Sequence, residues 1–312
     1  MKYKGLLSAV LSALFAVLLS VSQGCGTSRD GAVDPRYSDE IAKWHADRIE
    51  RLKSPTGWLS LAGLYWLKPG ENTFGTDPAN AIVFPAGKGP AIMGTIIVEG
   101  ANVRVKITPG VDVLHDGAPV DTLVLHHDQE EGIEPTVLSH GSLSWFPIER
   151  AGRLGIRVKD GESEALRLFT GIERFPVDRR WRIEGRLEPH DPPKTVEITS
   201  VLGDVTQEPS PGALVFEIGG KTYRLDPIAE SGDDELFVVF SDATSGKETY
   251  GGGRFLGVSR PAEDGLVVID FNKAYNPPCA LSPYATCPLP PPQNHLPTAV
   301  RAGEKTYKKP GH

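Results

Sequence analysis

The sequence predicts a mainly β protein, with two antiparallel β-sandwich or barrel-like units preceded by an N-terminal helix. Two observations carry this prediction. Short β-branched runs recur along the chain at spacings of about 8–12 residues, as in antiparallel sandwiches and barrels. Between them stand many of the 34 glycines and 27 prolines found among the 312 residues. Because glycine and proline interrupt helices, their frequency here predicts sheets joined by turns and not long helices.

Composition and charge exclude several classes of protein. Lysine and arginine number 33 against 40 acidic residues, a net charge of −7, so nothing overall draws the chain to a polyphosphate. We therefore expect no nucleic-acid partner. Three cysteines are too few for a disulfide-built scaffold. We also expect no cofactor and no bound metal.

The first residues have the order of a secretory leader. Lys2 and Lys4 precede an uncharged stretch of sixteen residues, 6–21, which ends in a small-residue exit at 22–25. The alternative is a transmembrane anchor, but sixteen residues fall short of the roughly 20 that span a bilayer. We predict a signal peptide over 1–24.

Cys25 stands directly after this exit and follows Gly24. The segment resembles the bacterial lipobox, in which the cysteine thiol is diacylated and becomes the new N-terminus. Ser22 occupies the position where leucine is usual, so an ordinary signal peptidase site is the alternative. We expect lipidation at Cys25, a tether over 25–36, and a protein anchored to the inner or outer membrane of the cell envelope, facing the periplasm or the surface.

The segment 37–71 is expected to hold the N-terminal helix and an apolar run. Apolar residues at nearly helical spacing predict a helix over Tyr37–Lys53 with Ser38 as its N-cap. The apolar run 57–67 contains Trp58 and Trp66. We expect these two side chains to be core anchors and not a ligand cage, because nothing cationic or sugar-specific accompanies them in the sequence.

Strands fill the rest of the chain in two groups, a first β domain over 72–174 and a second over 175–312. A short helix is expected over 162–169, near the end of the first domain, and the boundary is expected at 175–178. In the first group we expect strands at 81–84, 95–98, 103–107, 111–114, 122–126, 142–148 and 155–158. In the second we expect strands at 181–187, 195–199, 213–218, 221–225, 236–240, 254–256 and 266–271.

The stretches 74–84 and 110–120 resemble a forkhead-associated sandwich in their sequence pattern. The phosphothreonine site of that family does not carry over. Thr76 stands where an arginine usually follows the glycine, and the chain has no Ser-x-x-His between the strands. The resemblance therefore implies a sandwich and no phosphopeptide function.

Several familiar motifs are missing from the sequence. Gly220-Lys221-Thr222 is not a phosphate loop, because Val215 occupies the position of the required first glycine. No Gly-x-Ser-x-Gly elbow and no His-Glu-x-x-His occurs. His126 and His127 are adjacent, and adjacent residues of a strand point to opposite faces, so we expect surface histidines and no metal site.

The most informative segments lie near the C-terminus, at 240–256, 269–280, 282–294 and Ala302-Gly303-Glu304-Lys305. Together with Gly57-Trp58-Leu59-Ser60-Leu61-Ala62-Gly63-Leu64, they resemble the bacterial domain-of-unknown-function 1684 (DUF1684) family over nearly the whole mature chain. The resemblance implies one architecture and a shared polar site, and it implies no reaction.

Eight residues of these segments are candidates for binding or catalysis. Glycines at 251–253 give the backbone conformational freedom, so Arg254 is expected beside exposed N–H groups that suit an anion. The alternative is a hairpin loop whose polar side chains cap their own turn. Asp270 and Asn272 should share one face of the last strand. The full set is Asp242, Tyr250, Arg254, Asp270, Asn272, Tyr275, Asn276 and Glu304.

Cys279 and Cys287 stand in a proline-rich arm, which we expect to be extended and without ladder hydrogen bonds. In an oxidising periplasm a pair this close in sequence should form a disulfide. The alternative is a reactive thiol. The absence of a histidine next to Cys279 in the sequence argues against it.

Two functions stay open at this point. One is a lipid-anchored envelope protein whose polar site in the C-terminal β domain binds a small anionic or polar ligand. The other is an envelope hydrolase that uses a carboxylate pair, Asp270 and Glu304, or the thiol of Cys279. The hydrolase requires the candidate side chains to converge in one cleft.

Overall fold

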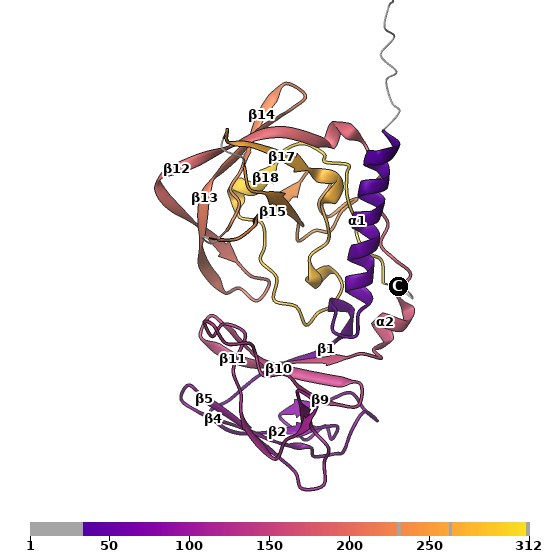
Figure 1. Ribbon diagram of the computed structural model, residues 1–312, viewed down its shortest axis with the longest axis vertical. Coiled ribbons are helices and arrows are strands. Elements are labelled where there is room, and N and C mark those ends of the chain that lie inside the picture. Colours follow the sequence, from indigo (N-terminus) through magenta and orange to yellow (C-terminus); the bar gives the residue numbers. More distant parts are fainter. Residues whose placement is uncertain (1–33, 230–231, 262–263, 310–312) are drawn as a thin grey trace, which may run out of the picture. The chain divides into compact units, whose positions relative to one another are not determined.

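The computed structural model describes residues 34–229, 232–261 and 264–309 as mainly β structure, which confirms the predicted fold class (Figure 1). The predicted leader, the lipidation at Cys25 and most of the tether lie outside the described residues. Within the described part, no helix combines the length and apolarity needed to cross a bilayer.

The helix α1 (Pro35–Lys53) confirms the predicted N-terminal helix. Its N-cap is Asp34, whose side chain accepts a hydrogen bond from the Arg36 N–H at 3.0 Å, so the prediction of Ser38 as N-cap is wrong. Proline is preorganised for the first turn of a helix, which explains the earlier start at Pro35. The buried face of α1 comprises Tyr37, Ile41, Arg48 and Leu52.

The first β region contains two sheets. One has the order β1-β11-β10-β9-β6-β7, with bounds β1 Leu61–Trp66, β11 Arg153–Asp160, β10 Leu143–Arg150, β9 Leu138–His140, β6 Leu114–His115 and β7 Ala118–Pro119. The other has the order β3-β2-β4-β5-β8, with bounds β3 Ile82–Val83, β2 Gly70–Gly75, β4 Gly94–Glu99, β5 Asn102–Ile107 and β8 Thr122–Val124. Strand β1, from the predicted apolar run, pairs antiparallel with β11.

Aromatic side chains from both sheets fill the core of this region. Phe74, Phe84 and Trp145 contact one another with ring centroids 4.9–5.6 Å apart. The prediction that Trp58 and Trp66 are core anchors is wrong, because Trp58 is 37% exposed and Trp66 is only partly buried. Each of these two rings instead lies under a guanidinium, Arg157 over Trp58 at 5.5 Å and Arg153 over Trp66 at 4.4 Å.

A short connection leads to the second β region. It contains α2 (Glu164–Leu168), which confirms the predicted short helix, and the 3-10 turn η2 (Arg179–Trp181). The Ser163 hydroxyl caps α2 by accepting a hydrogen bond from the Leu166 N–H. A further 3-10 turn, η1 (Trp58–Ser60), precedes β1.

The second β region also has two sheets. One has the order β14-β13-β12-β17, with bounds β14 Lys221–Leu225, β13 Val205–Ile218, β12 Arg182–Thr199 and β17 Leu266–Asp270. The other has the order β16-β15-β18, with bounds β16 Arg254–Ser259, β15 Glu235–Asp242 and β18 His295–Leu296. Phe216, Phe240 and Phe271 lie in their shared core.

Two predictions for this region need correction. The runs 181–187 and 195–199 form one long strand, β12, whose pairing with β13 shifts in register between Pro189 and Lys194. The proline-rich arm does form ladder hydrogen bonds, because β18 pairs in parallel with β15. The arm also holds two 3-10 turns, η4 (Pro278–Ala280) and η5 (Pro292–Asn294).

Candidate functional site

The eight predicted site residues fall into four groups. Asp242 and Arg254 form an ion pair in the interior. Tyr250 lies beside the two cysteines of the arm. The remaining residues make two clusters against α1, one around Asp270 and one around Glu304.

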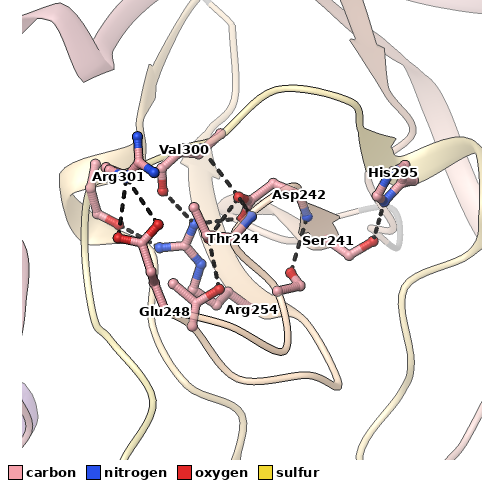
Figure 2. Close-up of polar contacts among 11 residues, drawn as sticks. Ser241, Asp242, Thr244, Glu248, Arg254, His295, Val300 and Arg301 are labelled. Atoms are coloured by element: carbon pink, nitrogen blue, oxygen red, sulfur yellow. Dashed lines mark hydrogen bonds and ion pairs between the residues drawn. The ribbon is translucent and has the colours of Figure 1, made fainter.

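The side chains of Asp242 and Arg254 are completely buried, and their Nη2–Oδ2 distance is 2.8 Å. The guanidinium also donates to the carbonyl oxygens of Val300 and Ala302. The other carboxylate oxygen of Asp242 accepts from the N–H and hydroxyl of Thr244 and from the Val300 N–H, at 2.7–3.1 Å. Figure 2 shows Arg254 beside Asp242, Thr244 and Val300.

This arrangement ties the end of β15 to β16 and to the chain around residue 300. A Cβ on Gly253, which has φ +83°, would clash with the Pro290 ring and the Phe240 carbonyl, so the predicted glycine freedom serves close packing. We expected Arg254 to stand beside a ligand anion, but its guanidinium is completely buried and pairs with Asp242. We assign Asp242 and Arg254 to the framework of the fold.

Asp270 is the centre of the first cluster against α1. The Tyr37 hydroxyl lies 2.9 and 3.0 Å from its two oxygens, and the Asn272 N–H donates to it at 3.1 Å. Burial, followed by the Asp270 carboxylate, raises the pKa of Tyr37 above its usual range. Asp270 and Asn272 do lie together, but they do not share a strand face. Asp270 is the N-cap of the 3-10 turn η3 (Phe271–Lys273), and Asn272 lies within that turn.

Glu304 is the centre of the second cluster and is 1% exposed. Arg48 of α1 donates to both of its oxygens, at 2.6 and 3.2 Å, and the Asn276 N–H donates at 2.7 Å. The Arg48 guanidinium also lies 4.4 Å from the ring centroid of Tyr275. Burial raises the pKa of Tyr275 and lowers that of the neighbouring His45, whose Nδ1 is 3.9 Å from the Glu304 carboxylate.

A cavity of about 960 Å³ lies along α1. Of the predicted site residues, Asp270, Tyr275 and Asn276 line it, whereas Asp242, Tyr250, Arg254, Asn272 and Glu304 do not. Most of its ionisable lining is basic, with five cationic residues against the carboxylates of Glu235 and Asp270. The five are Arg48, Arg51, Lys159, Arg182 and Lys273.

Two of these cations are already neutralised, since Arg48 pairs with Glu304 and Lys273 pairs with Glu40 at 2.7 Å. Over the described ranges, Arg51, Lys159 and Arg182 form no ion pair with a carboxylate. Lys159 donates a short hydrogen bond to the Thr56 carbonyl, and burial lowers its pKa. Among the described residues, these three cations therefore have no carboxylate at ion-pair distance, although Arg182 acts electrostatically on the Glu40 carboxylate.

Aromatic side chains form much of the rest of the lining. They come from α1, from η1, from β15 and β16 and from the chain after η3, and are Trp44, Trp58, Phe237, Phe255 and Tyr275. Arg157, whose guanidinium stands over the Trp58 ring, is 4% exposed, and its Nε has no hydrogen-bond partner in the described part of the chain. Burial lowers the pKa of Arg157 to about 10.

The hydrolase hypothesis needs Asp270 and Glu304 to act as a pair. The contacts of the two carboxylates are separate, with Tyr37 and Asn272 around Asp270 and with Arg48 and Asn276 around Glu304. A buried carboxylate already held by an arginine is poorly placed for proton transfer. We therefore do not carry the carboxylate-pair hydrolase forward.

His126 and His127 were expected on opposite faces of a strand, and the structure places them differently. His126 and His127 lie outside any strand, and both contact the Glu130 carboxylate, at 2.8 and 3.8 Å. Their placement on opposite faces of a strand was therefore wrong. In the part of the chain that is described, no group of three or more histidine, cysteine or acidic side chains could hold a metal ion.

Sequence reasoning missed the basic side chains of the cavity. One signal was present in the sequence. Arg48 follows Ile41 and Trp44 at helical spacing, so it lies on the apolar face of the helix, which is the face expected to be buried. A buried charge requires a partner or a function. Lys159 and Arg182 carried no such signal, because only the fold brings their strands to α1.

Comparisons with known proteins match the C-terminal part of the chain to a family model. Residues 167–305 match the family model "Protein of unknown function (DUF1684)". An uncharacterized protein from gene locus rrnAC0354 of Haloarcula marismortui, solved by solution NMR, is 35% identical over 44% of this chain and 77% of that chain, with a TM-score of 0.38. No curated protein matches. Over residues 167–305 the chain thus matches the DUF1684 family, whose function is unknown.

Proposed function

We propose that this protein is a lipid-anchored component of the cell envelope that binds a small anionic ligand with an aromatic or other apolar body. The binding site is the cavity beside α1. The observation that carries the proposal is the set of three cations in its lining, Arg51, Lys159 and Arg182, that have no carboxylate partner among the described residues. A ligand anion would supply that partner.

The size and lining of the cavity support a small molecule. Ligand pockets usually measure roughly 300–1,000 Å³ and combine apolar walls with a few placed polar groups. At about 960 Å³ this cavity lies within that range. Aromatic rings such as Trp44 and Tyr275 would cover the apolar body, and ring faces also favour stacking with a planar ligand.

The envelope location is supported by the sequence alone. Basic residues, an uncharged stretch and Cys25 after a small-residue exit follow the order of a lipoprotein leader. Acyl chains on Cys25 would hold the protein at the membrane, because each buried CH₂ contributes about 0.8 kcal/mol. The segment from Cys25 to the start of α1 at Pro35 would then separate the folded region from the lipid surface.

A pair of fluorescent probes tests the binding site. Anilinonaphthalene sulfonate carries one sulfonate on the same ring system that N-phenylnaphthylamine has without any charge. We expect Arg51→Gln and Arg182→Gln each to weaken sulfonate binding roughly fivefold, since an ion pair at a partly exposed site contributes about 1 kcal/mol. The affinity for the uncharged probe should change less than about twofold.

Arg186→Gln is the matched control. Arg186 lies on the same strand as Arg182, is exposed, and does not line the cavity. The proposal requires this variant to bind both probes as the unaltered protein does. Equal weakening by all three substitutions, or equal weakening of both probes, would mean that the sulfonate is held by general surface charge and that the cavity is not the site.

A further inference from the structure

The two cysteines of the proline-rich arm lie side by side. The Cys279 N–H points at Cys287 Sγ with a nitrogen–sulfur distance of 3.0 Å, and the two thiol groups are within hydrogen-bonding reach of each other. Both are free thiols in the structure. The predicted disulfide is therefore not formed here, and it stays a prediction for the oxidised protein.

Tyr250 is the third member of this group. Its hydroxyl lies close enough to the Cys279 sulfur for each group to shift the pKa of the other. Tyr250 begins a turn in which the Gly253 N–H donates to the Tyr250 carbonyl at 3.1 Å. A hydroxyl donor beside a sulfur stabilises a thiolate in preference to a thiol.

The two thiols differ in environment. Cys279 is partly exposed, whereas Cys287 is buried in an apolar cluster with Leu61, Val239 and Phe255. The hydrogen bonds from Cys287 and then Tyr250 lower the pKa of Cys279 to about 7, while the Cys279 sulfur and burial raise the pKa of Cys287 above its usual range. One sulfur is thus accessible and ionised near neutral pH, and the other is shielded and protonated.

We propose that Cys279 and Cys287 are a thiol–disulfide exchange centre, in which Cys279 attacks a disulfide substrate and Cys287 resolves the mixed disulfide. An accessible thiolate next to a buried thiol is the arrangement that this reaction needs. Tyr250 is a positioning residue that holds the Cys279 thiolate. The inference is independent of the ligand cavity, whose lining includes Pro278 but neither cysteine.

The reaction proceeds in two steps. In the first, the Cys279 thiolate attacks one sulfur of a substrate R–S–S–R, the Cys279–S–R bond forms, and RS⁻ leaves. In the second, Cys287 gives up its proton and attacks the Cys279 sulfur, the Cys279–Cys287 bond forms, and the second RS⁻ leaves. The two sulfurs of the protein are oxidised and the substrate disulfide is reduced. One released RS⁻ takes the proton that Cys287 gives up, and the other takes a proton from solvent, where Cys279 lost its own on ionisation.

The test uses the full chain with Cys25→Ser, so that Cys279 and Cys287 are the only thiols. The protein is reduced, freed of reductant and mixed with dithiodipyridine, an uncharged aromatic disulfide. We expect two equivalents of thiopyridone per chain and no retained adduct by intact mass. In Cys287→Ser we expect one equivalent and a retained mixed disulfide, and in Cys279→Ser a rate at least tenfold lower.

The pH profile separates an exchange centre from two merely neighbouring thiols. The rate should reach half its maximum near pH 7, the pKa of Cys279, whereas an ordinary thiol does so near 8.5. Tyr250→Phe should move the midpoint upward. Tyr284→Phe is the matched control, because Tyr284 lies between the cysteines in sequence, is 37% exposed and is not among the groups that shift the pKa of either thiol. It should leave the midpoint unchanged.

Brief alkylation of the unaltered native protein with iodoacetamide, followed by peptide mapping, gives an answer even if a serine variant fails to fold. Modification of Cys279 before Cys287 supports the proposal. Thiols that react only after denaturant is added, faster modification of Cys287, or a midpoint near 8.5 that Tyr250→Phe leaves in place would each overturn it.

Discussion

Replacing Arg254 by methionine should destabilise the C-terminal β region strongly. Methionine keeps most of the side-chain volume but removes the guanidinium that pairs with Asp242. Asp242 would keep its hydrogen bonds from Thr244 and Val300, but its Oδ2 would lose the Arg254 guanidinium. The Asp242 side chain is completely buried, so water cannot replace that partner. Leaving one charge of a buried pair uncompensated costs about 3–5 kcal/mol.

Urea unfolding followed by circular dichroism measures this effect. At about 2–4 °C of midpoint shift per kcal/mol, the melting temperature should also fall by roughly 6–20 °C. The double variant Arg254→Met/Asp242→Leu should lose less than the two single losses added together, because it removes the orphaned charge. Arg224→Met, in an exposed pair with Glu188 at 2.6 Å, serves as the control and should cost less than about 1 kcal/mol.

A loss below about 1 kcal/mol for Arg254→Met would refute the reasoning, since it would mean that the buried carboxylate needs no cation. Additive losses in the double variant would also contradict it. They would indicate that each side chain acts through its own packing and not through the pair.

Three further predictions follow from contacts with α1 and from the leader. Arg48→Met should leave the buried Glu304 carboxylate without its cation and speed hydrogen exchange in α1 at least tenfold, whereas the exposed pair Lys43–Asp47 can be broken without that effect. Because the pKa of Tyr37 is raised in the folded state, its contribution to stability is present below about pH 10 and is lost as the pH rises further; Tyr37→Phe should flatten that alkaline loss in urea titrations. Replacing Cys25 by alanine should move the protein from the membrane to the soluble envelope fraction and abolish palmitate labelling, and unchanged labelling would contradict lipidation at this residue.

The sequence was informative where local patterns decide the structure. The helix α1 and most strands follow from periodicity and turn residues, and the burial of Ile41 and Leu52 follows from helical spacing. Trp58 was misjudged because a large aromatic residue in an apolar run usually enters the core, and only the fold places Arg157 over its ring. Local patterns say little about partners that are distant in sequence.

The site shows the same limit. Asp270 and Asn272 were expected to share one face of a strand. They do lie together, but the strand ends at Asp270, two residues before Asn272. Arg254 was expected to face a ligand because it follows three glycines, and the sequence has no means of showing that Asp242 neutralises it in the interior. The cavity itself is formed by α1, β11, β12 and β15–β17, whose proximity is a property of the tertiary fold.

A crystal structure of the protein with anilinonaphthalene sulfonate tests the central claim most directly. The account predicts the sulfonate within about 4 Å of the cationic group of Arg51, Lys159 or Arg182, with the ring system against the aromatic wall of the cavity that includes Trp44 and Tyr275. Probe bound elsewhere while this cavity stays empty, or a sulfonate turned to solvent with no cation beside it, would contradict the account.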